Sequence, residues 1–178
     1  MFALNEKVVY PGHGVALISR IIERVVAGEV AHFYELKFLN KDMTILIPID
    51  NLETIGIRGL STKDYIESVF KIVMTPIVKS PLVELNNSSW NKRNKKYQSC
   101  LRSGNLVEIS KIYRDLHYLS LEKELSFGER NLLSQTELLL AEEISMVEQV
   151  VRDVAIEQLR SCFSPRVSSV VKGAEHTL

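Results

Sequence analysis

Histidine and cysteine are the side chains that most often carry catalysis or bind a metal, and this sequence uses few of them. Its four histidines and two cysteines are scattered, and none has the spacing of a metal site. His13 lies in the run Pro11–Gly14, PGHG, where glycines favour a turn with positive φ over a catalytic centre. The motifs of phosphate-binding loops, zinc proteases and serine hydrolases are also missing from the sequence. We therefore expect a protein that is not an enzyme and has no cofactor or bound metal.

The strongest chemical signal is a cluster of positive charge beside an aromatic residue. The segment 85–107 contains no acidic residue, and the sole tryptophan, Trp90, lies near its start. The basic residues of this segment are Lys92, Arg93, Lys95, Lys96 and Arg102. Bases without acidic partners on their own helix can approach phosphate, and a tryptophan beside polar residues either packs or binds a ligand. The same pattern fits a solvated helix face whose tryptophan closes a core.

Composition limits the class of protein that can carry this cluster. The chain has 178 residues, of which 46% are hydrophobic and 25% charged, which is typical of a globular protein and too apolar for a disordered one. The 22 basic and 22 acidic residues cancel, so the surface as a whole does not attract nucleic acid and only a local patch can. With no signal peptide, disulfide pattern or long apolar run, we expect a cytoplasmic monomer that does not contact a membrane.

The first third of the chain has the pattern of short strands joined by tight turns. Residues 30–39 alternate, with Tyr34, Leu36 and Phe38 on one face, and turn-forming residues precede and follow them. Residues 53–57 resemble a last strand before Gly59. We therefore predict an α+β protein that begins with a small antiparallel barrel of the Tudor or SH3 type over residues 1–60.

The remainder has helical periodicity, which predicts a compact all-helical domain over residues 61–162 and a flexible tail over 163–178. Ser126 and Glu129 have the spacing of a capping box that begins a helix, and Ser145 is interpreted as the start of another. The adjacent pair Glu142 and Glu143 is interpreted as part of a solvated helix face.

Several short motifs together resemble a known family. The opening segment Lys7–Ala16, KVVYPGHGVA, resembles the signature of the CarD/CdnL family of bacterial transcription regulators, whose N-terminal module also occurs in the transcription-repair coupling factor. Further matches follow in order along the chain: YELK at 34–37, MTILIP at 43–48, IGIR at 55–58, WNKR at 90–93, RSGN at 102–105, YRDL at 113–116 and LSFGER at 125–130.

The resemblance implies a partner for the N-terminal domain. Family members bind the β subunit of bacterial RNA polymerase through a Tudor-like polymerase-interaction domain. Arg24 matches a barrel arginine that contacts polymerase. A second polymerase-contacting arginine of some members falls at Leu46 in this chain, which implies an altered protein interface.

The resemblance also implies a role for the basic segment. Family members place their helical domain on promoter DNA at the upstream edge of the transcription bubble, where a tryptophan wedges into the minor groove and slows collapse of the bubble. Trp90 matches this tryptophan, and Lys92, Arg93 and Lys95 match basic positions that face the DNA backbone. So few bases bind DNA weakly at physiological salt, and attachment to polymerase would raise their local concentration at the promoter.

Two other readings remain open on the sequence alone. An RNA-binding or ribosome-associated protein could combine an SH3-like barrel with a basic helix, and Phe33 or Tyr34 could then stack on bases. A hydrolase that uses His13 is the third reading.

Overall fold

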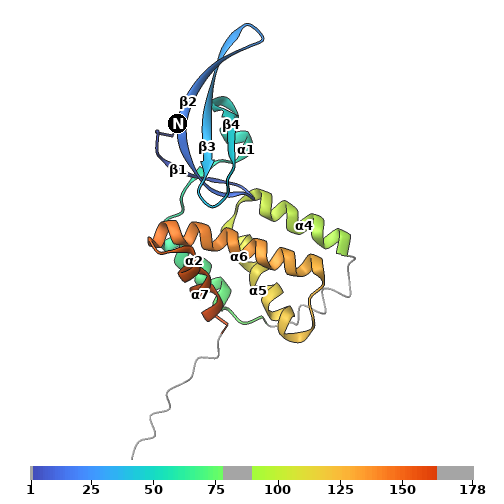
Figure 1. Cartoon of the computed structure of the whole chain (residues 1–178). Helices are drawn as coiled ribbons and strands as arrows, with labels where there is room; N and C mark the ends of the chain where they lie inside the picture. Colours follow the sequence, from blue (N-terminus) through green and yellow to red (C-terminus); the bar gives the residue numbers. More distant parts are fainter. Residues whose placement is uncertain (1, 78–89, 164–178) are drawn as a thin grey trace, which may run out of the picture.

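A computed structural model of the protein describes residues 2–77 and 90–163. Figure 1 shows a sheet of strands from the N-terminal part of the chain standing on a group of helices from the remainder. A long hairpin of this sheet projects away from the helices. The predicted α+β arrangement is therefore confirmed. The predicted tail lies outside the described residues except for Phe163.

The strands form one antiparallel sheet in the order β4-β3-β2-β1-β5. Their bounds are β1 Lys7–Tyr10, β2 Gly14–Val26, β3 Glu29–Phe38, β4 Thr44–Pro48 and β5 Arg58–Gly59. The expectation of a closed barrel is wrong, because β4 pairs only with β3 and the two-residue β5 pairs only with β1 in the described part of the chain. The sheet is therefore open.

One face of the sheet carries the N-terminal core. Tyr34, Leu36 and Phe38 are buried on it, as their alternation predicted. The Tyr34 hydroxyl donates a hydrogen bond of 2.8 Å to the carbonyl oxygen of Phe2.

The predicted strand over 53–57 is wrong: a 3₁₀ turn, Ile49–Asn51, leads into the short helix α1, Leu52–Ile55. Gly56, with φ of 82°, ends this helix in the left-handed conformation that favours glycine.

The helices share a second core. Their bounds are α2 Lys63–Met74, α4 Trp90–Ser103, α5 Leu106–Glu122, α6 Phe127–Glu148 and α7 Arg152–Ser161.

The capping box that begins α6 is confirmed, since the Ser126 hydroxyl accepts from the Glu129 N–H and the Glu129 carboxylate accepts from the Ser126 N–H. The second predicted helix start, at Ser145, is wrong: α6 continues to Glu148, and the Ser145 hydroxyl donates to the carbonyl of Glu142 inside it. Within the described residues, no helix has the length and apolar character needed to cross a membrane.

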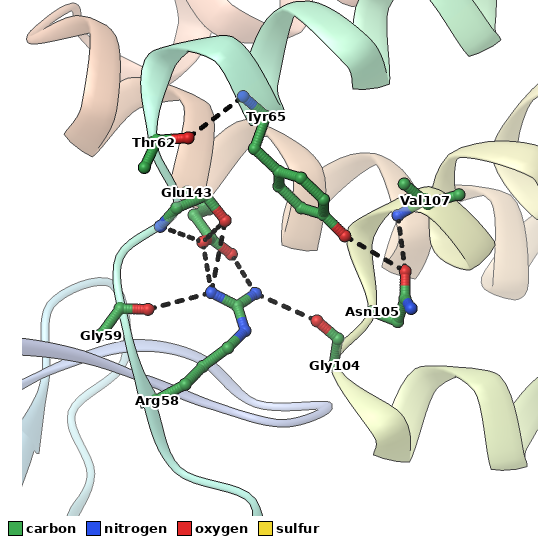
Figure 2. A network of polar contacts seen from close by, with 9 residues as sticks. Arg58, Gly59, Thr62, Tyr65, Gly104, Asn105, Val107 and Glu143 are labelled. Carbon is green, nitrogen blue, oxygen red and sulfur yellow. Dashed lines mark hydrogen bonds and ion pairs between the residues drawn. The ribbon is translucent and has the colours of Figure 1, made fainter.

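The sheet and the helices are joined through Glu143 of α6. Its carboxylate, only 2% exposed, accepts two hydrogen bonds from the Arg58 guanidinium, at 2.6 and 2.8 Å. It also accepts bonds from the backbone N–H and the hydroxyl of Ser61, at 2.9 and 2.6 Å. Figure 2 shows that Arg58 reaches a third element, because its other donors bond to the carbonyls of Gly59 and Gly104. Arg58 therefore connects β5, α6 and the C-terminal end of α4.

The neighbouring carboxylate, Glu142, contacts the sheet directly. Its Oε2 atom accepts a hydrogen bond of 3.3 Å from the N–H of Val15, and Glu142 is 5% exposed. Burial raises the pKa of Glu142, and the Val15 N–H opposes that rise by favouring the charged form. Gly14 has a φ of 101°, and a Cβ at this position would overlap Glu142 Oε2. The interpretation of Glu142 and Glu143 as a solvated face is therefore wrong, because both carboxylates are buried at the junction of sheet and helices.

The Glu143→Gln variant should lose much of the stability that this junction provides. The change keeps the shape of the side chain but leaves the Arg58 guanidinium without its carboxylate. We expect the free energy of unfolding to fall by about 1–3 kcal/mol. The fall should lie near the lower value, because the Arg58 side chain is 34% exposed and water screens its charge. Urea unfolding followed by circular dichroism would measure this fall.

The matched control is Glu124→Gln, which removes the same charge from a carboxylate whose side chain is 91% exposed and 3.4 Å from Arg130. We expect little change there, because exposed ion pairs contribute little to stability. Equal effects of the two variants would contradict the importance assigned to the junction.

Candidate functional site

The basic helix α4 has two different faces. The residues of its exposed face are Asn91, Lys92, Lys95, Lys96, Ser99, Arg102 and Ser103. They recur at the spacing of one helical stripe, and α4 contains no acidic residue. Within the described part of the chain, none of the ion pairs involves Lys92, Lys95 or Lys96. The exposed stripe is therefore a surface of unneutralised positive charge.

Trp90 belongs to the other face of α4. It lies at the helical spacing of Tyr97 and the buried Leu101, which pack against the helical core. Trp90 itself is half-buried, at the first residue of the helix. Its indole lies against Gly128 in the first turn of α6, and the Arg93 guanidinium carbon lies 5.9 Å from its ring centroid. The tryptophan is thus partly a packing residue and partly a surface residue.

The structure separates the four predicted DNA-binding residues into two pairs. Trp90 and Arg93 lie together on the side that faces α6, and Arg93 is half-buried. Lys92 and Lys95 are exposed on the opposite side of α4. A guanidinium close to an indole ring is attracted to its π face. Arg93 therefore has a local partner in Trp90, whereas the two lysines point to solvent.

The two ends of α4 have different surroundings. Its C-terminal end meets the sheet, where Gly104, with φ of 64°, packs against Pro11, and a Cβ at Gly104 would lie 3.2 Å from that ring. Its N-terminal end, where Trp90 begins the helix, lies away from the sheet (Figure 1). The PGHG run, expected to form a turn, thus also fixes α4 relative to the sheet.

The predicted polymerase contacts lie on the sheet face opposite the core. Arg24 of β2 pairs with Ala31, and Leu46 of β4 pairs with Glu35, four residues further along β3. Because strand side chains alternate and paired residues share a face, Arg24 and Leu46 point to the same side of the sheet. Arg24 is exposed in the projecting hairpin, and Leu46 is half-buried. The outer edge of β4 pairs with no other described strand.

The residues behind the two alternative readings have structural roles. Tyr34 is fully buried, so Phe33, which is half-buried, is the one of the pair left for stacking on RNA. The His13 ring lies edge-on to Tyr10, with centroids 5.0 Å apart, and burial together with Lys41 lowers the pKa of His13. Among the described residues, no group of three or more His, Cys, Asp or Glu side chains could hold a metal ion.

Three contributors were missed by reasoning from the sequence. The sequence interpretation places Glu142 and Glu143 on a solvated helix face and assigns no role to Gly128. Nothing in the local pattern distinguishes them, because each acquires its role from a residue far away in the chain: Val15, Arg58 and Trp90, respectively.

Comparison with protein families follows the same division into sheet and helices. A model described as the CarD-like/TRCF RID domain matches residues 2–61, and a model described as the CarD C-terminal domain matches residues 74–160. The chain belongs to the CarD family. The resemblance noted in the sequence is therefore confirmed. Proteins of this family are transcription factors and not enzymes, and the RID domain implies interaction with RNA polymerase.

The chain is also similar to a protein of Bacillus subtilis (strain 168) named "Putative transcription factor YdeB". The two are 24% identical over 161 residues, which make up 90% of this chain and 99% of that protein. The similarity thus extends through both domains of this CarD-family protein.

The exposed lysine stripe makes a prediction about salt dependence. If Lys92 and Lys95 meet phosphates, the Lys92→Gln/Lys95→Gln variant should flatten the plot of log K against log salt by about two units, at roughly 0.9 per contact. Fluorescence anisotropy with labelled duplex DNA between low and moderate salt would measure the slope.

The matched control is Lys63→Gln/Lys71→Gln, which removes two exposed lysines from α2. This variant should keep the slope of the unmodified protein. If the α4 and α2 variants change the slope equally, net charge decides the affinity and the stripe has no special role.

Proposed function

We propose that this CarD-family protein binds the β subunit of RNA polymerase through its N-terminal sheet and stabilises the open promoter complex by contacting DNA through α4. In this proposal residues 1–60 dock to polymerase and residues 61–162 contact the promoter. The observation that carries it is the position of Trp90, the chain's sole tryptophan, at the outer end of a helix without acidic residues.

The open sheet supports docking to a protein. β4 is an edge strand whose outer N–H and C=O groups are free of strand partners in the described residues, and such an edge can pair with a strand of another protein. Arg24 is exposed on the projecting hairpin, where it can meet a carboxylate of the partner. Leu46 lies on the same side of the sheet and provides apolar contact in place of a second arginine.

The lysine stripe of α4 and the position of Trp90 support contact with DNA at the end of the helix far from the sheet. Its lysine stripe provides attraction to phosphate that does not depend on sequence, and Trp90 provides an apolar ring. Docking of the sheet to polymerase raises the local concentration of this weak DNA-binding helix at the promoter. Since no described feature reads base edges, selectivity comes from the position of the bubble and from DNA deformability.

Trp90 acts at the upstream edge of the transcription bubble. A side chain that wedges into the minor groove separates a base step, at a cost of about a few kcal/mol of unstacking. At the edge of a bubble the stack is already interrupted, so this cost is smaller. The wedge then stabilises the unpaired state and slows the return to duplex.

The Trp90→Ala variant should shorten the lifetime of the open complex while leaving polymerase binding intact. Loss of about 1–3 kcal/mol of stacking corresponds to a roughly 5- to 150-fold change in stability. Competitor-challenge kinetics on a promoter with bacterial RNA polymerase would measure the lifetime. Trp90→Phe keeps an aromatic ring of smaller area, so its open-complex lifetime should lie between those of the unmodified protein and Trp90→Ala.

Thermal unfolding of the same variant distinguishes a wedge from a core residue. A fully packed tryptophan would cost about 3–5 kcal/mol of folding stability when replaced by alanine. Since Trp90 is half-buried, we expect a smaller loss. If the open-complex lifetime of the variants depends on the fraction of unfolded protein and not on whether residue 90 has an aromatic ring, the proposal that Trp90 acts as a wedge is wrong.

The Arg24→Glu variant should weaken binding of the full-length protein to RNA polymerase. Reversing an interfacial arginine replaces attraction by repulsion, and a tenfold or larger loss of affinity, about 1.4 kcal/mol or more, is expected. Surface plasmon resonance with immobilised polymerase would measure it. Lys71→Glu, in the last turn of α2, applies the same change of charge outside the sheet and should bind normally. Equal losses for both variants would contradict docking through the sheet.

A further inference from the structure

Gly128 differs from the turn-forming glycines of the chain. Among the described residues, five glycines have positive φ, where a side chain would strain the backbone, and Gly128 is not one of them. It lies in the first turn of α6, a helix of 22 residues. Glycine is among the poorest helix formers, and alanine is the best. Backbone geometry and helix propensity therefore give no reason for a glycine at this position.

The space beside Gly128 supplies the reason. A Cβ atom at residue 128 would lie 2.7 Å from Cζ2 of Trp90, 3.2 Å from Cε2 and 3.4 Å from Cη2. The first distance is shorter than carbon atoms tolerate, and the neighbour is a rigid indole ring and not the end of a flexible chain. An alanine at 128 would therefore force the indole or the start of α6 to move.

We propose that Gly128 is a positioning residue for Trp90: its missing side chain forms a seat that holds the indole in the orientation used at the edge of the bubble. This inference rests on the proposed function of Trp90. It deepens that function, because it explains how a half-buried tryptophan is presented to DNA by a second helix.

The start of α6 is well suited to act as a fixed seat. Glu129, 3% exposed, accepts hydrogen bonds from the Ser126 N–H at 2.9 Å and from the Lys123 ammonium at 2.8 Å. The Ser126 hydroxyl in turn accepts from the Glu129 N–H. These contacts hold the first turn of α6, so that movement to accommodate a new Cβ falls mainly on the indole.

A seated indole also has an energetic consequence for binding. Immobilising a side chain at an interface costs conformational entropy, and a side chain that is already held in its bound orientation avoids most of that cost. The Arg93 guanidinium, 5.9 Å from the ring centroid, restricts the indole further. Trp90 is therefore presented to DNA in a restricted set of orientations.

The Gly128→Ala variant of the full-length protein tests the seat. Because Trp90 is the sole tryptophan, its fluorescence reports the environment of the indole directly. We expect emission at longer wavelength, stronger acrylamide quenching in the folded protein, and an open-complex lifetime shortened toward that of Trp90→Ala. Without a clash, the gain in helix propensity would instead raise the melting temperature by about 2–4 °C. A higher melting temperature with unchanged quenching would overturn the proposal.

Gly59→Ala is the matched control. A Cβ at Gly59 would meet nothing within 4 Å, and the residue also lacks positive φ. This variant should leave the emission spectrum, the quenching and the open-complex lifetime unchanged. If it changes the fluorescence as much as Gly128→Ala does, the response is not specific to the seat and the proposal fails.

Double variants separate failure of the seat from failure of the proposed function. In the Trp90→Ala background, Gly128→Ala should shorten the open-complex lifetime no further. If Gly128→Ala alone unfolds the protein, adding Trp90→Ala should restore folding, because it removes the indole that the new Cβ meets. A further shortening, or no restoration, would overturn the seat. If Trp90→Ala itself leaves the lifetime unchanged, the proposed wedge is wrong, while the fluorescence of Gly128→Ala still decides whether residue 128 positions the indole.

Discussion

The two adjacent carboxylates of α6 are the contact on which the rest of the molecule depends. Glu143 is almost fully buried and is compensated by the bidentate Arg58 guanidinium and by Ser61, while Glu142 accepts from the backbone of Val15. A buried carboxylate is costly unless its oxygens are hydrogen-bonded. Any other position of the sheet relative to the helices would leave these two carboxylates without their donors. The pair therefore fixes the position of the sheet relative to the helices as well as contributing to stability.

This junction links the two surfaces assigned to polymerase and DNA. Arg58 bonds to the carbonyl of Gly104, which ends α4, and Gly104 packs against Pro11. The helix that carries the lysine stripe is thereby fixed at one end to the sheet. In a two-part binder, the second contact gains from the first only when the distance and orientation between them match the target. A fixed α4 sets one distance and orientation between the two proposed surfaces.

Trp90 shows how one residue can pack against a neighbouring helix and still be partly accessible for the contact with DNA that we propose. It occupies the core-facing stripe of α4, yet it begins the helix, and its side chain is only partly buried there. Gly128 and Arg93 restrict the buried part. An aromatic ring that is already immobilised offers a large apolar area at low entropic cost. This suits the proposed contact with DNA, because a few lysines alone would bind DNA weakly.

The sequence by itself determined the α+β order, the core face of β3, the start of α6 and the family, because each depends on local periodicity, capping residues or contiguous motifs. It also located Trp90 and the basic helix. Only the tertiary structure decided that the sheet is open, that residues 52–55 are helical, and that α6 continues through Ser145. It also decided that Glu142 and Glu143 are buried and that Gly128 faces an indole, since the burial of a side chain depends on partners distant in the chain, which a local pattern does not contain.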